Sequence, residues 1–174
     1  MNNRKLMEKV NAVLRNFLDK DRNLLMLNAS ERSISHKLAE HLGKEFPDGD
    51  ADYEYNRWGD RPKTLPEVLF NDITDYDQDA RAIFSDIIVY KRQLPDNLLV
   101  IEVKKSSSRE NNDKDRIKLI AFTDPEGDYR YKVGLFIVFD VENQKVDKVR
   151  CFENGDEVEC NGVMANLEAL GHGL

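Results

Sequence analysis

The chain has 174 residues, of which 40% are hydrophobic and 34% charged, and its formal net charge is −7. This length suits one ordinary domain over residues 1–174, and the composition excludes a disordered chain. No apolar run reaches the roughly 18 residues that a membrane span requires, and the N-terminus lacks the apolar core of a secretory signal. We therefore expect a cytoplasmic protein without membrane contact, whose acidity opposes strong autonomous binding to nucleic acid.

The sequence contains two cysteines, Cys151 and Cys160, on either side of the turn signal FENGDE. In a reducing compartment two such thiols are more often free than bridged, so free thiols are expected. The three histidines and two cysteines show no spacing typical of a zinc site.

Two helices are expected in the N-terminal part of the chain. Residues 3–19 carry apolar side chains at three- and four-residue spacing, which predicts an amphipathic helix. The short apolar run at 24–27 stays unassigned. A second helix of about 13 residues is expected to begin after Asn28 or Ser30 and to end at Gly43.

Glu31 is the polar residue of interest on this second helix. It precedes Ile34 by three positions and Leu38 by seven, so its side chain projects from the buried face. The spacing from Asn28 to Glu31 also matches a capping box, in which the glutamate bonds back to the cap amide.

The rest of the chain predicts mainly strands. The expected elements are a strand at 51–58, an acidic insertion at 60–80 with one short helical turn, a hairpin at 84–105, a helix at 113–122, a strand at 131–141 and a final hairpin with a short tail. The crossover helix favours parallel pairing of the strands that it joins. Gly134 within the last long strand indicates a close backbone approach or a bulge. The helix is expected to face inward through Ile117, Ile120 and Ala121.

Charged residues interrupt the apolar hairpin at 84–105. If its loop covers residues 92–96, the cross-strand pairs are Tyr90 with Leu98, Ile88 with Val100, and Asp86 with Glu102. A slip of one residue would place Asp86 and Glu102 on opposite faces of the sheet.

Two carboxylates about 5 Å apart at Cβ destabilise a sheet, and burial raises the cost. Lys104 neutralises only part of this charge, whereas a divalent cation removes the difficulty. Glu31, on its inward helix face, adds a further carboxylate. The alternative for Glu102-Val103-Lys104 is an exposed strand of alternating charges. The combination of Asp86 in the neighbouring strand with Glu31 favours metal binding or catalysis instead.

This pattern resembles the PD-(D/E)XK nuclease superfamily over about residues 28–141. The resemblance consists of Asp86, then Glu102-x-Lys104 at the end of a second strand, with Glu31 before and a crossover helix after. Ser85 stands where the family has proline. The resemblance implies a restriction-endonuclease-like αβββαβ core, in which a mixed sheet is flanked by helices. An extra N-terminal helix and a C-terminal hairpin are added here.

The resemblance also implies roles for single residues. Asp86 and Glu102 would hold Mg²⁺, for which Mn²⁺ can substitute, with the Val103 carbonyl as a further ligand. Glu31 would bind the metal directly or through water. Lys104 would orient or help to deprotonate the attacking water.

Basic residues follow the motif and point to a phosphate-binding rim. Lys105, Arg109 and Lys118 are candidates for contacts with nucleic acid, although Lys114, Asp115 and Lys118 also match an ordinary solvated helix face. The leading prediction is a Mg²⁺-dependent nuclease acting on DNA. The alternative, favoured by the overall acidity, is a catalytically inactive binding or assembly module. A nuclease this acidic would depend on a homodimer or a partner subunit for its DNA affinity.

Overall fold

The computed structural model describes residues 1–55, 57–58, 61–62, 85–91, 96–108 and 112–160. The helices are α1 (Asn3–Asp21), α2 (Asn23–Met26), α3 (Glu31–Glu45) and α4 (Asp113–Thr123). The strands are β1 (Asp50–Tyr55), β2 (Arg57–Trp58), β3 (Arg61–Pro62), β4 (Ser85–Lys91), β5 (Asp96–Lys105), β6 (Val133–Asp140), β7 (Lys145–Glu153) and β8 (Asp156–Val158).

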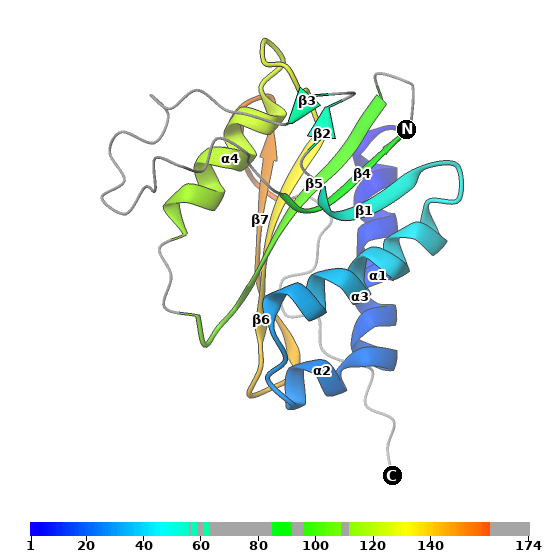
Figure 1. The fold of residues 1–174 in the computed structure, drawn as a ribbon, viewed down its shortest axis with the longest axis vertical. Helices are drawn as coiled ribbons and strands as arrows, with labels where there is room; N and C mark the ends of the chain where they lie inside the picture. The colour runs from blue at the N-terminus through cyan, green and yellow to red at the C-terminus, as the bar shows by residue number, and fades with distance from the viewer. Residues whose placement is uncertain (56, 59–60, 63–84, 92–95, 109–111, 161–174) are drawn as a thin grey trace.

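Six strands form one mixed sheet in the order β1-β4-β5-β6-β7-β8, and β2 pairs with β3 separately. The pair β5–β6, which α4 connects, is parallel as predicted, and the other neighbours in the large sheet are antiparallel. Helices α1 and α3 lie on one side of this sheet and α4 on the other (Figure 1). The predicted α/β class, with a mixed sheet flanked by helices, is therefore confirmed.

Helix α1 agrees with the prediction and runs slightly further, to Asp21. The Asn2 side chain caps it by accepting a hydrogen bond of 2.9 Å from the backbone N–H of Lys5. The run at 24–27, left unassigned above, contributes most of the single turn of α2.

The beginning and the end of α3 differ from the predictions. Ser30, in an extended conformation, is the N-cap, and its hydroxyl accepts the backbone N–H three residues on at 3.1 Å. The capping box from Asn28 to Glu31 is wrong, because Asn28 has a left-handed backbone with φ of 49°. The end at Gly43 is also wrong, since the helix continues to Glu45.

The alternation of side chains in β5 divides the core in two. Leu99, Ile101 and Val103 belong to the cluster packed under α1 and α3. Val100 belongs to the cluster under α4. Glu102 is two residues after Val100, so its side chain points to the same face, on the α4 side of the sheet.

The register of β4 and β5 matches the prediction in the part of the strands next to Asp86 and Glu102. Ile88 pairs with Val100 as expected. The expected pair of Tyr90 with Leu98 is wrong, because Tyr90 pairs with Asn97 and Leu98 is the extra residue of a β-bulge. Because of the bulge, Leu98 packs in the same core cluster as Leu99. The bulge lies on the loop side of the pair formed by Ile88 and Val100, so the register next to Asp86 and Glu102 is as predicted.

The inward face of α4 also differs from the prediction. Its buried residues are Asp115, Leu119, Phe122 and Thr123. The expected set of Ile117, Ile120 and Ala121 is only partly buried. Compared with the prediction, the helix is rotated about its axis, and a charged residue, Asp115, lies at the start of the face that packs on the sheet.

The close backbone approach predicted at Gly134 is confirmed. A Cβ added there would lie 3.1 Å from Thr123 Cγ2, 3.2 Å from Phe152 Cβ and 3.3 Å from Leu119 Cδ2. Two of these atoms belong to α4, so the absence of a side chain at Gly134 lets α4 settle closely onto β6.

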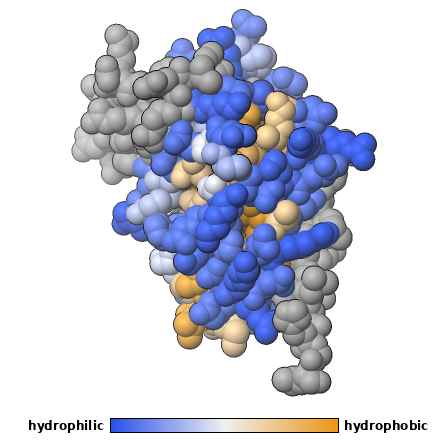
Figure 2. Space-filling model, turned by 90° about the vertical axis from the view of Figure 1, so that its right-hand side faces the viewer, coloured by the Kyte–Doolittle hydropathy of each residue, from blue (hydrophilic) through white to orange (hydrophobic). Residues whose placement is uncertain are grey.

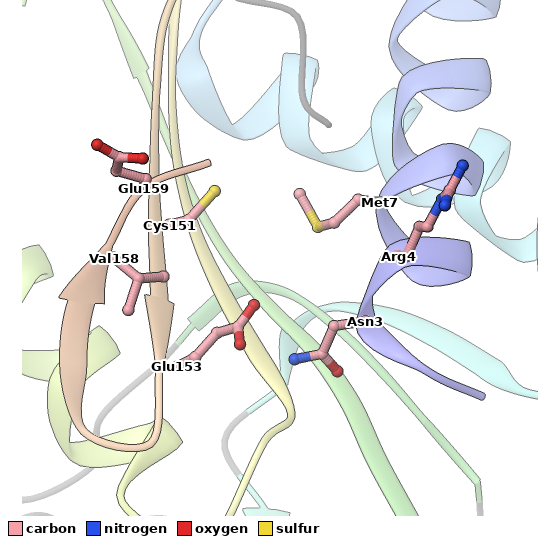
Figure 3. Close-up of a pocket in the computed structure, with 7 residues that line it drawn as sticks. All are labelled: Asn3, Arg4, Met7, Cys151, Glu153, Val158 and Glu159. Atoms are coloured by element: carbon pink, nitrogen blue, oxygen red, sulfur yellow. The ribbon is translucent and has the colours of Figure 1, made fainter. Parts of the chain in front are cut away.

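The expectation of free thiols is wrong, because Cys151 and Cys160 form a disulfide with a Cα–Cα distance of 5.3 Å. The antiparallel pairing of β7 and β8 brings the residues after β8 back alongside Cys151. Beside this disulfide, a pocket of about 550 Å³ opens between the start of α1 and the β7–β8 hairpin (Figure 3). Its lining consists of Asn3, Arg4, Met7, Cys151, Glu153, Val158 and Glu159.

The surface on the side of α1 and α3 is mostly hydrophilic, with small apolar areas between the charged side chains (Figure 2). The largest exposed apolar side chains of the described chain include Met26 and Leu27, at the end of α2. None of the described helices is both long and apolar enough to span a membrane. The predicted insertion at 60–80 lies outside the described residues, apart from β3.

Candidate carboxylate and lysine site

Asp86 and Glu102 lie on neighbouring strands on the α4 side of the sheet. The register of Ile87 with Ile101 and Ile88 with Val100, continued by one residue, places the two acidic residues opposite each other. Asp86 Oδ2 accepts a hydrogen bond of 2.7 Å from the backbone N–H next to Glu102, that of Val103. The like charges therefore sit together, in the arrangement that the hairpin pattern predicts.

Glu102 is the most enclosed charged group of this site, with 2% of the residue exposed. Its Oε2 accepts a hydrogen bond of 2.9 Å from Lys118 Nζ. Its Oε1 is buried and has no hydrogen-bond partner among the residues that the structure describes. Burial raises the pKa of Glu102 well above the usual range, Lys118 opposes this shift, and the charges of Asp86 and Asp115 add to it.

Burial also raises the pKa of Asp86, but less than that of Glu102. The hydrogen bond from the Val103 N–H and the charge of Lys118 act on the Asp86 carboxyl group in the opposite direction. Burial therefore weakens the preference of both carboxyl groups for their ionised form.

Two lysines and Asp115 complete the centre of the site. Lys118 Nζ lies 2.7 Å from Asp115 Oδ1, and Lys104 Nζ lies 3.3 Å from Asp115 Oδ2. Burial opposes ionisation of Asp115, but the nearby ammonium groups outweigh it and lower its pKa. Burial likewise opposes the charge of Lys118, and Glu102 and Asp115 outweigh it, so the pKa of Lys118 is raised. This part of the site is an ion-pair network.

Glu31 reaches the site from the start of α3, which lies beside the end of β5. Its Oε1 accepts a hydrogen bond of 2.9 Å from the backbone N–H of Lys105, and its Oε2 lies 3.5 Å from Lys104 Nζ. The Lys105 side chain turns away and donates to Asn28 Oδ1 and to the Ala29 carbonyl, both at 2.9 Å. It braces the turn that leads into α3.

Of the four residues singled out as catalytic, Asp86 and Glu102 lie opposite each other on β4 and β5, and Lys104 contacts Glu31 at the end of β5. Lys118, expected at a phosphate-binding rim or on a solvated face, is instead paired with carboxylates inside the site. Asp115 was assigned no functional role by the sequence. The signal for Asp115 is its spacing from the apolar residue Leu119. It lies four residues earlier on the same helix, and therefore on the same face. Arg109 lies outside the described residues.

Within the described part of the chain, no group of three or more His, Cys, Asp or Glu residues is arranged to hold a metal ion. Mg²⁺ does not require such a group, because it takes one or two carboxylates and completes its shell with water and phosphate oxygens. The paired carboxylates of Asp86 and Glu102 fit this demand. The buried Glu102 Oε1, which lacks a hydrogen bond, is an oxygen for which a hard cation would supply the missing partner.

Comparison with protein-family models and with curated proteins gives no match for this chain. The function therefore has to be inferred from the geometry of the site.

Proposed function

We propose that the protein is a metal-dependent nuclease that hydrolyses phosphodiester bonds in DNA, and that its core is a restriction-endonuclease-like member of the PD-(D/E)XK superfamily. The observation that supports this most strongly is the half-satisfied carboxylate of Glu102, buried beside Asp86 with one oxygen unpartnered. An unpartnered oxygen on a buried carboxylate is costly, and a bound cation would remove this cost.

Each residue of the site has a role in this proposal. Asp86 and Glu102 would hold Mg²⁺, with the Val103 carbonyl as a further ligand, and Glu31 would act on the ion through a bridging water. When bound, the ion lowers the pKa of a coordinated water and stabilises the charge that develops on the phosphoryl group. Lys104, between Glu31 and Asp115, orients the attacking water or accepts its proton.

The charge of the chain limits how a DNA substrate could be bound. A chain with a net charge of −7 gains little from long-range attraction to DNA, so local contacts have to position the phosphate backbone. Lys118 and Arg109 are the proposed contacts, and Lys105, whose ammonium group braces the turn before α3, would contribute its charge from there. A homodimer or a partner subunit is proposed to supply the remaining affinity.

The test is cleavage of linear, supercoiled, single-stranded and branched DNA with Mg²⁺, Mn²⁺ or a chelator. We expect metal-dependent cutting that falls by about 100-fold or more in Asp86→Asn and Lys104→Met, because both remove groups at the reacting centre. The matched control is Lys5→Met, which removes an exposed lysine of α1 on the other side of the sheet. Equal cutting by the wild type and both site variants would contradict the proposal.

One observation favours the inactive binding or assembly module. Lys118 and Lys104 already pair with Glu102, Asp115 and Glu31, as in a purely structural network. In that case wild type and variants would be equally inactive, and Mg²⁺ would leave the thermal unfolding of both unchanged.

A further inference from the structure

Lys118 is the residue of the site whose position the nuclease pattern does not explain. It projects from the middle of α4, and only 15% of its side chain is exposed. Its ammonium group lies between Glu102 Oε2, at 2.9 Å, and Asp115 Oδ1, at 2.7 Å. It therefore contacts the carboxylate that is best suited to hold a cation.

The site keeps an excess of negative charge in spite of this contact. When all groups are ionised, the four carboxylates of Glu31, Asp86, Glu102 and Asp115 exceed the two ammonium groups by two charges. Glu102 Oε1, which has no hydrogen-bond partner among the described residues, belongs to this acidic group. One divalent cation would balance the excess, but such an ion would share Glu102 with Lys118.

We propose that Lys118 is an internal counter-ion that leaves Glu102 when a divalent cation binds, and that it then serves as a contact for the substrate phosphate. This inference rests on the cation site of the proposed function. Two positive charges on the same buried carboxylate repel each other strongly where water is largely excluded. Lysine can respond, because its charge sits on a flexible four-carbon stem.

Asp115 determines where the ammonium group goes. It lies three residues before Lys118 on α4 and holds the Lys118 ammonium at 2.7 Å independently of Glu102. The released ammonium group therefore stays at the edge of the site, tethered to α4. A positive charge at this position is suited to orient a backbone phosphate.

The first test is the affinity of the full chain for Mg²⁺, measured by calorimetry. Lys118→Met removes the competing charge and keeps most of the apolar stem, so we expect Mg²⁺ to bind at least about tenfold more tightly than to the wild type. Lys5→Met should bind as the wild type does. Equal affinities of Lys118→Met and wild type, or no binding to either, would overturn the proposal.

A second test uses the wild type alone, so it does not depend on the folding of a variant. In ¹H–¹⁵N spectra of lysine ammonium groups, a buried, paired Lys118 should give a signal protected from exchange in chelator. We expect this signal to shift or broaden on titration with Mg²⁺. An unchanged Lys118 signal at saturating Mg²⁺ would contradict its displacement.

The two proposals fail in different ways. Tighter Mg²⁺ binding by Lys118→Met, in a protein that cuts no nucleic acid, supports the counter-ion and contradicts the nuclease. Metal-dependent cutting combined with an unchanged Mg²⁺ affinity in Lys118→Met supports the nuclease and contradicts the counter-ion.

Discussion

Glu102 is held where the surrounding residues oppose its ionisation, and this conflict is the main physical feature of the site. Burial removes water from the carboxylate, and Asp86 and Asp115 add like charge. Lys118 compensates only one of its two oxygens. A buried charge left in this condition is costly unless it takes up a proton or a cation.

This conflict predicts how stability depends on pH in the presence of a chelator. Because the pKa of Glu102 is raised above its ordinary 4.5, the folded state holds a proton that the unfolded state releases between these two values. The stability associated with this group is fully present below pH 4.5 and is lost as the pH rises through the folded pKa. Asp86 contributes with the same sign.

Thermal unfolding of the wild type and of Glu102→Gln, measured from pH 4.5 upward in chelator, checks this expectation. Glutamine cannot ionise, so its melting temperature should decline less over the range in which the wild type loses stability. Parallel pH curves for the two proteins would show that Glu102 does not titrate in this way.

The sequence was informative about the residues on strands and less so about those on helices. Asp86, Glu102 and Lys104 were found because strand alternation fixes the face of each side chain once the register is known. Asp115 and Lys118 were missed as a pair inside the site. Their helix carries partly buried isoleucines on a flank, which made the wrong face look apolar.

At the scale of elements, the position of α4 determines whether Lys118 and Asp115 reach the strands. Helix α4 contacts β6 closely at Gly134, where Thr123 and Leu119 approach. This contact fixes the height of the helix above the sheet. Its charged residues and Glu102 then meet at hydrogen-bonding distance.

Gly134→Ala should therefore destabilise the protein and disturb the site. An added Cβ would lie 3.1–3.3 Å from three neighbouring atoms, so we expect a loss of about 1–3 kcal/mol in the free energy of unfolding. Denaturant unfolding measures this loss.

Gly43→Ala, within helix α3, is the matched control. Its added Cβ would meet only the Cβ of Ala51, in β1, at 3.9 Å. Relief of the glycine cost should stabilise this helix by about 1 kcal/mol. If Gly134→Ala were as well tolerated as Gly43→Ala, the close contact between α4 and β6 could not be what positions the helix.

The predictions for the β4–β5 register and for the start of α3 were partly wrong, and each has a local cause. The β-bulge at Leu98 inserts a residue that no alternation pattern reveals, and it shifts the pairs on the loop side only. The sequence offers both Asn28 and Ser30 as the N-cap of α3. Ser30 is the N-cap, and Asn28 has a left-handed backbone that does not suit this position.

At the scale of the whole molecule, the order of elements was predictable from the chain. Helix, strands, crossover helix and strand follow one another as expected, and the crossover leads to the parallel pair β5–β6. The disulfide was not predictable, because the assumption of a reducing compartment decided against it. The contact itself depends on how β8 folds back on β7.

This disulfide should contribute to the global stability of the chain. It closes a short loop, with a sequence separation of nine residues, and restricts the unfolded chain by about 2–3 kcal/mol. We expect a reductant to lower the denaturant midpoint of the wild type accordingly. The double variant Cys151→Ala/Cys160→Ala should not respond to reductant, and an equally unresponsive wild type would argue against the bond.

A divalent cation between the carboxylates of Asp86 and Glu102 is the central element of the proposed site. A crystal of the wild-type protein grown with Mn²⁺, with diffraction recorded at a wavelength where manganese scatters anomalously, tests this most directly. We predict an anomalous peak in contact with both carboxylates, including Glu102 Oε1, and a Lys118 side chain no longer bonded to Glu102. A map without such a peak at saturating Mn²⁺, with Lys118 still bonded to Glu102, would contradict a cation site at these carboxylates.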